Sequence, residues 1–246
     1  MTNSFTKYTF VIPARMESSR FPGKPLKKLS DRPIIDWVYE NCSKSKFCEE
    51  VFIATDSEEI SKYCFDTKKK YLMTGENNCA SNRVAEASKK IDKEWIVEVQ
   101  GDEPLLWASI MDDWLYKCSE KNDNNPDLFL SIAKLNDNEA DDPSYVKIIK
   151  DSSNKLQWVS RSRIPCNLKK PFSEDYFRHT GFHLWKKESL LNFALISPSP
   201  IENAEDTHAT RLVENNFFAK TIELPVTQSI DNPDDLLKAE MILKRK

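Results

Sequence analysis

The stretch VIPARMESSRFPGKPL, residues 11–26, begins as an apolar strand and then places Arg15, Arg20 and Lys24 in the loop that follows. Backbone N–H groups at the end of such a strand can face a phosphate, and the three cations would add positive charge there. Arginine grips phosphate oxygens in bidentate fashion, whereas lysine acts as a point charge. The alternative is a solvated surface loop whose charges share no ligand. The segment lacks the glycines of a Walker A loop or a Rossmann GxGxxG loop, so it is neither of these.

The composition favours one globular domain. A chain of 246 residues suits one large α/β domain, or one domain with a small insertion. Hydrophobic residues make up 39% and charged residues 30%, which is typical of a folded and not a disordered chain. The net charge of −3 gives no overall basic field for nucleic acid. A local cluster of cations must therefore hold any anionic ligand.

The cysteines and the N-terminus favour a cytoplasmic protein. The six cysteines are irregularly spaced and form no CxxC pair, so reduced thiols are expected. With only three histidines and no cysteine pair at metal-ligand spacing, a structural zinc site is not expected. The segment MTNSFTKYTF lacks the features of a signal peptide, and no apolar run is long enough to span a membrane.

Strands and helices alternate through the first hundred residues. Aromatic and β-branched runs predict strands at 8–13, 50–55, 71–74 and 95–100, and helical spacing predicts helices at 33–45, 58–67 and 81–91. This alternation predicts an α/β fold with a parallel sheet and helices on both faces. Ligands bind such sheets beyond the carboxyl ends of the strands. Residues 14–26 and 100–104 are both expected there, facing one cleft.

The pattern changes from about residue 127. The segments LFLSIAKL, YVKIIKD and KLQWVS read as strands without helices between them, and DNEADDP reads as a polar loop. We interpret them as an antiparallel addition within the same domain. Helices are expected again at 187–194, 204–215 and 233–244.

Two further motifs carry carboxylates. In VEVQGDEP, residues 97–104, a strand delivers Asp102 and Glu103 to its carboxyl end. A carboxylate there could hold Mg²⁺ together with a substrate phosphate. The alternative is an ordinary turn aspartate. In SIDNPDDLLKAE, residues 229–240, Asn232 and Pro233 read as a helix start, and Asp231 could be a second metal carboxylate.

Together these motifs resemble the 3-deoxy-manno-octulosonate (Kdo) cytidylyltransferases, the CMP-Kdo synthetase family. The family pattern Pro-Ala-Arg followed by Arg-x-Pro-Gly-Lys-Pro-Leu occurs at residues 13–15 and 20–26. The remaining matches are ATD (54–56), VQGDEP (99–104), DPSYVKIIKD (142–151), SRSRIP (160–165), RHTG (178–181) and DNPDD (231–235). Their order and spacing extend over nearly the whole chain.

The resemblance implies a fold and a reaction. The expected fold is a Rossmann-like nucleotidyltransferase, a single domain over residues 1–246 with an antiparallel segment around 127–159 used in homodimerisation. The implied reaction joins CTP and a 2-keto-3-deoxy sugar acid to give a CMP-sugar and pyrophosphate, for lipopolysaccharide or capsule synthesis. The implied cofactor is Mg²⁺, with no side-chain nucleophile required.

The resemblance also implies roles for individual residues. The nucleotide-binding set is Ala14, Arg15, Arg20, Lys24, Arg83, Gln100 and Asp102, and the catalytic set is Arg15, Lys24 and Asp102. The metal carboxylates are Asp102 and Asp231, and the sugar-acid set is Arg161, His179, His183 and His208.

Departures from the family pattern cluster at the presumed sugar and base contacts. Residues 77–83 read NNCASNR where the family has His-x-Ser-Gly-Thr-(Glu/Asp)-Arg. His183 replaces a common Tyr, and His208-Ala209 replaces Glu-Gln. A site built to hydrogen-bond sugar hydroxyls cannot lose those partners without a penalty.

Three hypotheses therefore stay open. The chain activates Kdo or a close relative; it activates a different ulosonic or nonulosonic acid, such as an amino-substituted one; or it is a catalytically silent homologue with a binding or regulatory role. Retention of Arg15, Lys24, Asp102 and Asp231 weighs against the third.

Overall fold

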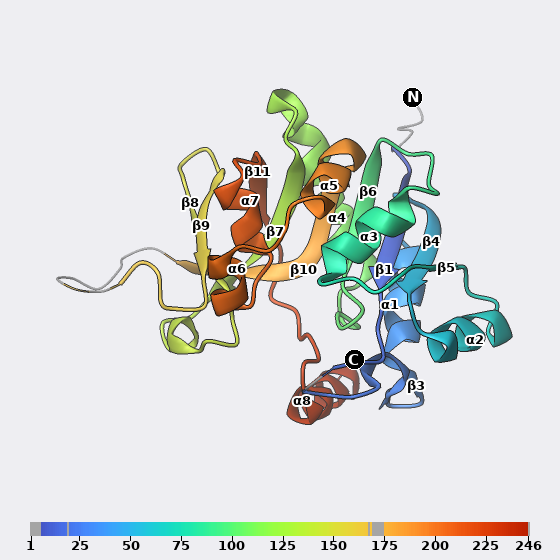
Figure 1. The fold of residues 1–246 in the computed structure, drawn as a ribbon. Helices are drawn as coiled ribbons and strands as arrows, with labels where there is room; N and C mark the ends of the chain where they lie inside the picture. The colour runs from blue at the N-terminus through green and yellow to red at the C-terminus, as the bar shows by residue number, and fades with distance from the viewer. Residues whose placement is uncertain (1–5, 19, 167, 169–174, 246) are drawn as a thin grey trace, which may run out of the picture.

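A computed structural model describes residues 6–18, 20–166, 168 and 175–245. Its described part contains a nine-stranded mixed sheet with the order β11-β7-β10-β6-β1-β4-β5, and β8 and β9 extend it beside β10 (Figure 1). The strands are β1 (Tyr8–Pro13), β4 (Cys48–Thr55), β5 (Tyr71–Met73), β6 (Trp95–Val99), β7 (Leu128–Leu135), β8 (Lys147–Lys150), β9 (Leu156–Ser160), β10 (Tyr176–Lys186) and β11 (Ala219–Glu223). The α/β class expected from the alternating pattern is confirmed.

The parallel part of the sheet is centred on β1. Strands β4 and β6 pair with it in parallel on either side, and β5 continues the parallel run beyond β4. Strand β10 lies antiparallel between β6 and β7, and β11 is parallel to β7. The carboxyl ends of β1 and β6 therefore lie side by side, as the alternation predicted.

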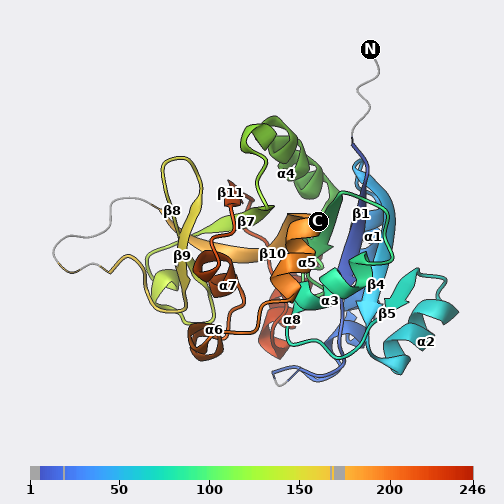
Figure 2. The same cartoon turned by 45° about the horizontal axis from the view of Figure 1, so that its top comes forward.

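Helices cover both faces of the sheet (Figure 2). The helices α1 (Ile34–Ser43), α2 (Glu58–Asp66) and α4 (Ala108–Glu120) pack on one face, and α3 (Ala80–Ser88), α5 (Lys187–Ala194) and α7 (Ala209–Glu214) pack on the other. Strand β1 contributes to the hydrophobic cores on both faces of the sheet, because its successive side chains point to opposite faces. Phe10 and Ile12 lie in the core beneath α1, α2 and α4, and Val11 lies in the core beneath α3, α5 and α7.

Several helix boundaries follow local capping chemistry. The Ser57 side chain accepts a hydrogen bond from the Ile60 N–H and caps α2, and Asn232 caps α8 (Pro233–Leu243) with Pro233 in its first turn. The single helix expected over 204–215 is wrong. Two short helices, α6 (Pro200–Glu205) and α7, replace it because Asp206 adopts a left-handed backbone with φ 45° that ends α6. Helix α4 and strands β10 and β11 had no counterpart in the sequence analysis.

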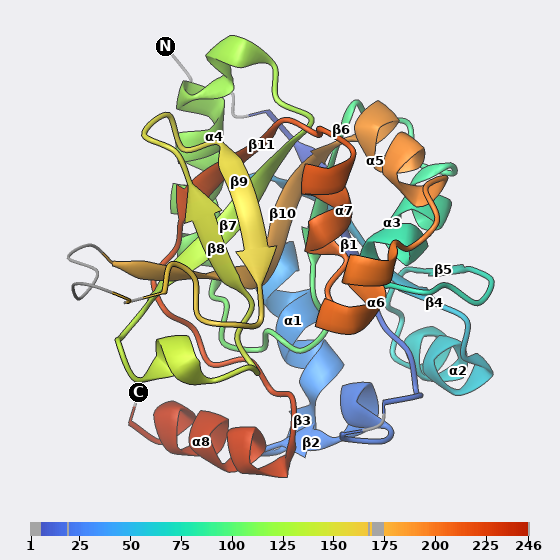
Figure 3. The ribbon, with the colours of Figure 1, turned by 60° about the vertical axis from the view of Figure 1, so that its left-hand side comes forward.

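The region 127–159 divides into two parts. Strand β7 is almost wholly buried inside the main sheet, between β10 and β11. Strands β8 and β9 form an antiparallel hairpin beside β10. The hairpin lies at the left-hand side in Figure 1 and faces the viewer in Figure 3. The antiparallel addition is therefore the hairpin, and β7 belongs to the central sheet.

A small third core brings the C-terminal helix to the loop after β1. It contains Phe21 from that loop, Ile34 from α1, and Ile230 and Ala239 from the α8 region, together with Leu29 and Leu105. The two-stranded hairpin of β2 (Lys28–Leu29) and β3 (Arg32–Pro33) lies beside α8 (Figure 3). This packing carries Asp231 from the end of the chain to the first loop. No helix in the described ranges is both long and apolar enough to cross a membrane.

Candidate active site

A cleft of about 190 Å³ opens at the carboxyl ends of β1 and β6. It is lined by Ala14, Arg15, Arg20, Lys24, Arg83, Gln100, Asp102 and Asp231, together with Pro13, Glu17, Ser18, Pro25, Asn77, Cys79, Ala80 and Gly101. The structure thus gathers all seven residues of the expected nucleotide-binding set, and both expected metal carboxylates, around one cavity.

The loop after β1 is folded back on itself by backbone and side-chain contacts. Gly23 has φ 71°, a left-handed conformation that glycine adopts without a side-chain clash, and its N–H donates to the Met16 carbonyl at 2.9 Å. The Ser18 hydroxyl accepts from the Phe21 N–H at 3.2 Å. Lys24 then opens a short 3₁₀ turn, η1 (Lys24–Leu26), and its side chain points into the cleft.

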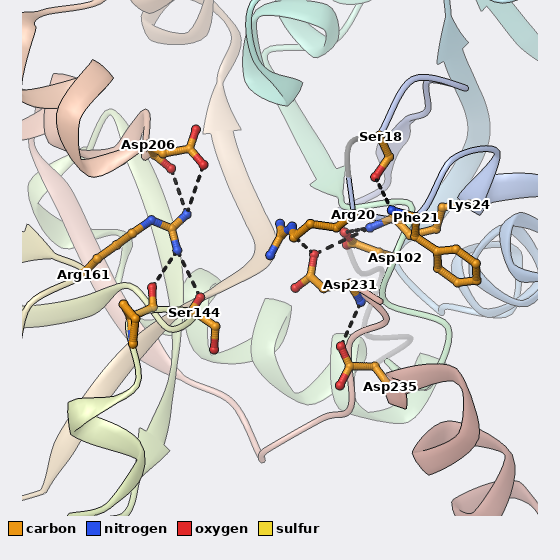
Figure 4. A network of polar contacts seen from close by, with 11 residues as sticks. Ser18, Arg20, Phe21, Lys24, Asp102, Ser144, Arg161, Asp206, Asp231 and Asp235 are labelled. Carbon is orange, nitrogen blue, oxygen red and sulfur yellow. Dashed lines mark hydrogen bonds and ion pairs between the residues drawn. The ribbon is translucent and has the colours of Figure 1, made fainter. Parts of the chain in front are cut away.

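Two carboxylates converge on the Lys24 ammonium (Figure 4). Its Nζ atom lies 2.7 Å from Oδ2 of Asp102 and 3.7 Å from Oδ1 of Asp231. Arg20 reaches the same Asp231 oxygen at 3.1 Å. A loop, a strand end and a helix start thereby bring two cations and two anions to one point. Such a cluster can hold a highly charged ligand because it offers both anion-binding and metal-binding groups.

The donor set fits Mg²⁺ as part of a shared shell. Carboxylate oxygens are the ligand type that this hard cation prefers, usually one or two of them with substrate phosphates and water. In the described ranges, no group of three or more His, Cys, Asp or Glu side chains could hold a metal alone. Asp102 and Asp231 would therefore supply only part of the coordination, and a phosphate ligand would complete it.

Arg83 contributes to the wall of the cleft through an internal ion pair. Its side chain is almost fully buried, and it donates to Asp56 at 2.6 Å and to the Thr74 hydroxyl at 2.7 Å. Asp56 therefore pairs with Arg83, and the neighbouring Ser57 caps α2. These contacts hold Arg83 in the wall of the first cleft.

A second cleft of about 490 Å³ adjoins the first. Its lining includes Arg161, Arg178, His179 and His208, and it shares Arg20, Gln100, Asp102 and Asp231 with the first cleft. Two ligands, one in each cleft, would thus meet at these four shared residues. His183 is not in the lining of either cleft.

Arg161 stands across the second cleft from the carboxylate cluster (Figure 4). Its guanidinium donates to the carbonyls of Glu205 at 2.6 Å, Pro143 at 2.9 Å and Asp206 at 2.9 Å. The buried Lys147 ammonium donates in turn to the Arg161 carbonyl. Because carbonyls already occupy the guanidinium, its expected role with a sugar carboxylate stays a prediction.

Three histidines gather beside the second cleft. The Nε2 atoms of His179 and His183 lie 3.1 Å apart, and the His208 Nε2 lies 3.3 Å from the Ser81 hydroxyl. Burial lowers the pKa of His179 to about 3 and of His208 to about 4, and it lowers the pKa of His183 well below its ordinary value. The three imidazoles are therefore neutral near pH 7, and they act as hydrogen-bonding groups.

The sequence analysis did not predict that two acids near the clefts are buried. Burial raises the pKa of Glu98 to about 7 and, with the neighbouring Asp102 charge, raises the pKa of Glu103 to about 7. Glu98 could have been noticed because it interrupts the apolar strand WIVEV. The importance of Glu103 and Lys147 had no comparable signal, since it depends on contacts between distant segments.

A family model described as cytidylyltransferase matches residues 9–224 of the chain. The chain belongs to the cytidylyltransferase family. It is a nucleotidyltransferase, as the motifs predicted. A 3-deoxy-manno-octulosonate cytidylyltransferase from Syntrophotalea carbinolica is 33% identical, with 96% of this chain and 98% of that relative aligned. One from Chloroherpeton thalassium is 32% identical, covering 98% and 99% of the two chains.

Solved structures agree with this assignment. A CMP:2-keto-3-deoxy-manno-octonic acid synthetase complexed with CTP matches this cytidylyltransferase with a TM-score of 0.89 at 27% identity, covering 98% and 99% of the two chains. The 4-diphosphocytidyl-2C-methyl-D-erythritol synthase of Anaerococcus prevotii has a TM-score of 0.64 at 13% identity and shares the fold. The expected mostly parallel nucleotidyltransferase fold is confirmed.

Proposed function

We propose that this cytidylyltransferase transfers CMP from CTP to the anomeric hydroxyl of 3-deoxy-manno-octulosonate or a close relative, releasing pyrophosphate. The observation that carries the proposal is the junction of the two clefts at Arg20, Gln100, Asp102 and Asp231. A nucleotide in the first cleft and a sugar acid in the second would bring the α-phosphate and the hydroxyl together there. The names of the close relatives support both substrates.

The reaction requires positioning and charge neutralisation, with no side-chain nucleophile. The anomeric oxygen forms a bond to the α-phosphorus and loses its proton, and the bond from that phosphorus to the pyrophosphate oxygen breaks. Arg15 and Arg20 line the first cleft with exposed side chains, and the less exposed Lys24 lies deeper at the carboxylates. These cations would neutralise the triphosphate and stabilise the leaving pyrophosphate.

Mg²⁺ is the proposed metal. Held by Asp102 and Asp231 with phosphate oxygens, it would neutralise charge on the triphosphate and orient the leaving group. In the protein alone, Lys24 offsets the mutual repulsion of the two carboxylates, since its Nζ contacts both. With the carboxylates neutralised by a bound metal, Lys24 would be able to contact a phosphate, because its side chain already lies inside the cleft.

A second candidate acceptor is favoured by the histidines of the second cleft. His179 and His208 present neutral imidazoles to a space that a sugar acid would fill. His208 stands where the family pattern has Glu, so the carboxylate of the family pattern is missing at that position. An ulosonic or nonulosonic acid with a different substituent, such as an amino group, would then be the natural substrate.

We also propose a homodimer that uses the β8–β9 hairpin. The hairpin stands at the edge of the molecule and exposes Trp158. An exposed tryptophan on an edge hairpin is typical of a contact surface.

The experiment that tests the function is a pyrophosphate-release screen. The purified protein is offered each of the four nucleoside triphosphates with a panel of sugar acids that includes Kdo, amino-substituted Kdo and nine-carbon acids. Release that requires CTP together with one sugar acid supports CMP transfer. The absence of release with every pair contradicts it.

A further inference from the structure

Glu98 is a fully buried carboxylate that lines neither cleft. It lies on β6 directly opposite His183 of β10. Its Oε1 accepts from the Gln100 Nε2 at 2.8 Å, and its Oε2 accepts from the Trp185 Nε1 at 2.9 Å and from the Ser81 hydroxyl at 2.9 Å. Burying an acid is unfavourable even when it is hydrogen-bonded. Packing alone therefore does not explain why Glu98 stands in this apolar strand.

Gln100 lines both clefts, and its side chain is held tightly against β10. The Gln100 N–H donates to the Gly181 carbonyl at 2.7 Å. A Cβ atom placed on Gly181 would lie only 2.6 Å from the Gln100 Cγ, so the glutamine chain packs against bare glycine backbone. With its path fixed in this way, the remaining freedom of Gln100 is the direction in which its amide faces.

The Glu98 carboxylate decides that direction. Above its pKa of about 7, Glu98 is mainly ionised. An ionised carboxylate only accepts hydrogen bonds, so it selects the amide nitrogen of Gln100 and turns the amide oxygen the other way. No donor to the Gln100 Oε1 comes from the described residues, which leaves this oxygen available to a ligand. The Trp185 N–H can only donate, and it therefore holds the carboxylate in place from the other side.

We propose that Glu98 is a positioning residue that fixes the Gln100 amide with its oxygen toward an O–H or N–H donor of the ligand bound at the junction of the clefts. The inference rests on the proposed function, because the donor belongs to the nucleotide or to the sugar acid. Both substrates carry such groups, and separate measurements on each decide which one Gln100 meets.

The decisive variant is Glu98→Gln, which keeps the shape of the side chain. Its amide oxygen must face the Trp185 N–H, because two donors cannot face one another. Its amide nitrogen then faces Gln100, which has to turn its oxygen inward and present its NH₂ group to the ligand. We expect kcat/KM to fall roughly 10- to 100-fold, as for the loss of one hydrogen bond to a buried polar group.

A double-mutant cycle tests whether Glu98 acts through Gln100. Gln100→Ala should lower kcat/KM by a similar factor, and adding Glu98→Gln should lower it by no more than about two-fold further, because no amide remains to misdirect. A rise confined to the KM for CTP assigns the donor to the nucleotide. A rise confined to the KM for the sugar acid assigns it to the acceptor.

Trp185→Phe is the matched control. It removes one hydrogen bond from the same carboxylate and leaves the direction of Gln100 unchanged, so it should lower the melting temperature with little change in kcat/KM. If it impairs turnover as much as Glu98→Gln, or if the two effects in the cycle are additive, the positioning role is wrong. If Gln100→Ala retains wild-type kinetics, the inference also fails, while CTP-dependent pyrophosphate release by the wild type still supports CMP transfer.

A second measurement does not depend on any variant folding. A crystal structure of the wild-type protein with CTP, and another with CTP and a non-reacting sugar-acid analogue, would show the partners of each Gln100 amide atom. Nε2 at Glu98 with Oε1 at a ligand donor supports the inference. A Gln100 side chain turned away from Glu98 in both complexes overturns it.

Discussion

The Nε2 atoms of His179 and His183 lie 3.1 Å apart, and their rings are stacked with centroids 4.8 Å apart. One imidazole must therefore donate, and the other must be a neutral acceptor. Because burial lowers the pKa of both rings, both are neutral near pH 7. The Nδ1 atom of His183 is buried and has no partner among the described residues. A proton added to this pair would create a charge with no compensating anion in contact.

The first prediction is that His183 destabilises the protein as the pH falls. Burial lowers its pKa well below 6.5, so below that pH the unfolded chain binds a proton that the folded chain does not. The contribution of neutral His183 to the free energy of unfolding is complete above pH 6.5 and is lost as the pH falls below 6.5. We expect His183→Phe to reduce the drop in melting temperature between about pH 7 and pH 5, measured by differential scanning calorimetry.

The comparison with the wild type isolates this effect from other titrating groups. Glu98 and Glu103 have raised pKa values of about 7, so they stabilise the fold at low pH and lose that contribution as the pH rises toward 7. Their effect is opposite in sign and present in both proteins. Parallel melting curves for the variant and the wild type across this pH range would show that His183 is not the titrating group.

The second prediction concerns the two carboxylates at Lys24. Asp102→Asn and Asp231→Asn should each lower kcat by about 10²- to 10³-fold, since each would remove a charge that we propose holds the metal at the developing transition state. Both side chains are partly exposed, so the melting temperature should change little. The measurement is pyrophosphate release across a Mg²⁺ titration.

Asp234→Asn is the matched control for these variants. Asp234 is exposed in the first turn of α8 and is not part of either cleft. It should retain wild-type turnover and Mg²⁺ dependence. Near wild-type activity of both Asp102→Asn and Asp231→Asn at limiting Mg²⁺ would refute the metal assignment.

The strands and helices could be predicted where apolar side chains recur at the regular spacing of a strand or a helix. Strand β1 and helix α5 have the bounds that the sequence analysis gave, because their apolar residues match the sheet and helix patterns. Strand β10, YFRHTGFHLWK, was missed because it lines the second cleft and carries polar residues there. Helix α6 ends at a left-handed Asp206, which no periodic pattern reveals.

The residues that form the site could be predicted from the sequence, but the contacts between them could not. Motif resemblance named the residues that gather at the junction, since the ends of adjacent parallel strands meet there. It could not show that Arg83 pairs with Asp56, or that carbonyls occupy Arg161, because these contacts join segments far apart in the sequence. It also placed His183 at the acceptor, whereas the structure puts His183 behind His179.

The third prediction is a homodimer formed through the β8–β9 hairpin. Trp158 is 36% exposed on β9, and burying it against a second copy would remove apolar surface from water. Light scattering at micromolar concentration should give twice the chain mass for the wild type, and Trp158→Glu should shift it toward the monomer. Leu195→Glu, at a more exposed apolar residue outside the hairpin, should stay dimeric. A monomeric mass for the wild type would contradict the proposed homodimer.

The fourth prediction concerns the acceptor. Of the three departures from the family at this end of the chain, only His208 lines the second cleft. Ala209 is 1% exposed within the core, and His183 lies behind His179. The choice of sugar acid should therefore depend mainly on His208, with His183 acting through the position of its partner ring.

His208→Glu restores the residue type of the family pattern and should shift preference toward ordinary Kdo. A neutral imidazole cannot reproduce every hydrogen bond that a carboxylate accepts, and each lost contact to a buried polar group costs about 1–3 kcal/mol, or roughly five- to 150-fold. We expect the wild type to use an amino-substituted or nine-carbon acid with a higher kcat/KM than Kdo, and His208→Glu to narrow or reverse that ratio. His183→Tyr, which restores the other family residue outside the cleft, should change the ratio less. The measurement is kcat/KM for each acid at saturating CTP, with the melting temperature of each variant recorded to confirm folding. Equal use of Kdo and the best analogue by the wild type would mean that the histidines leave the acceptor unchanged.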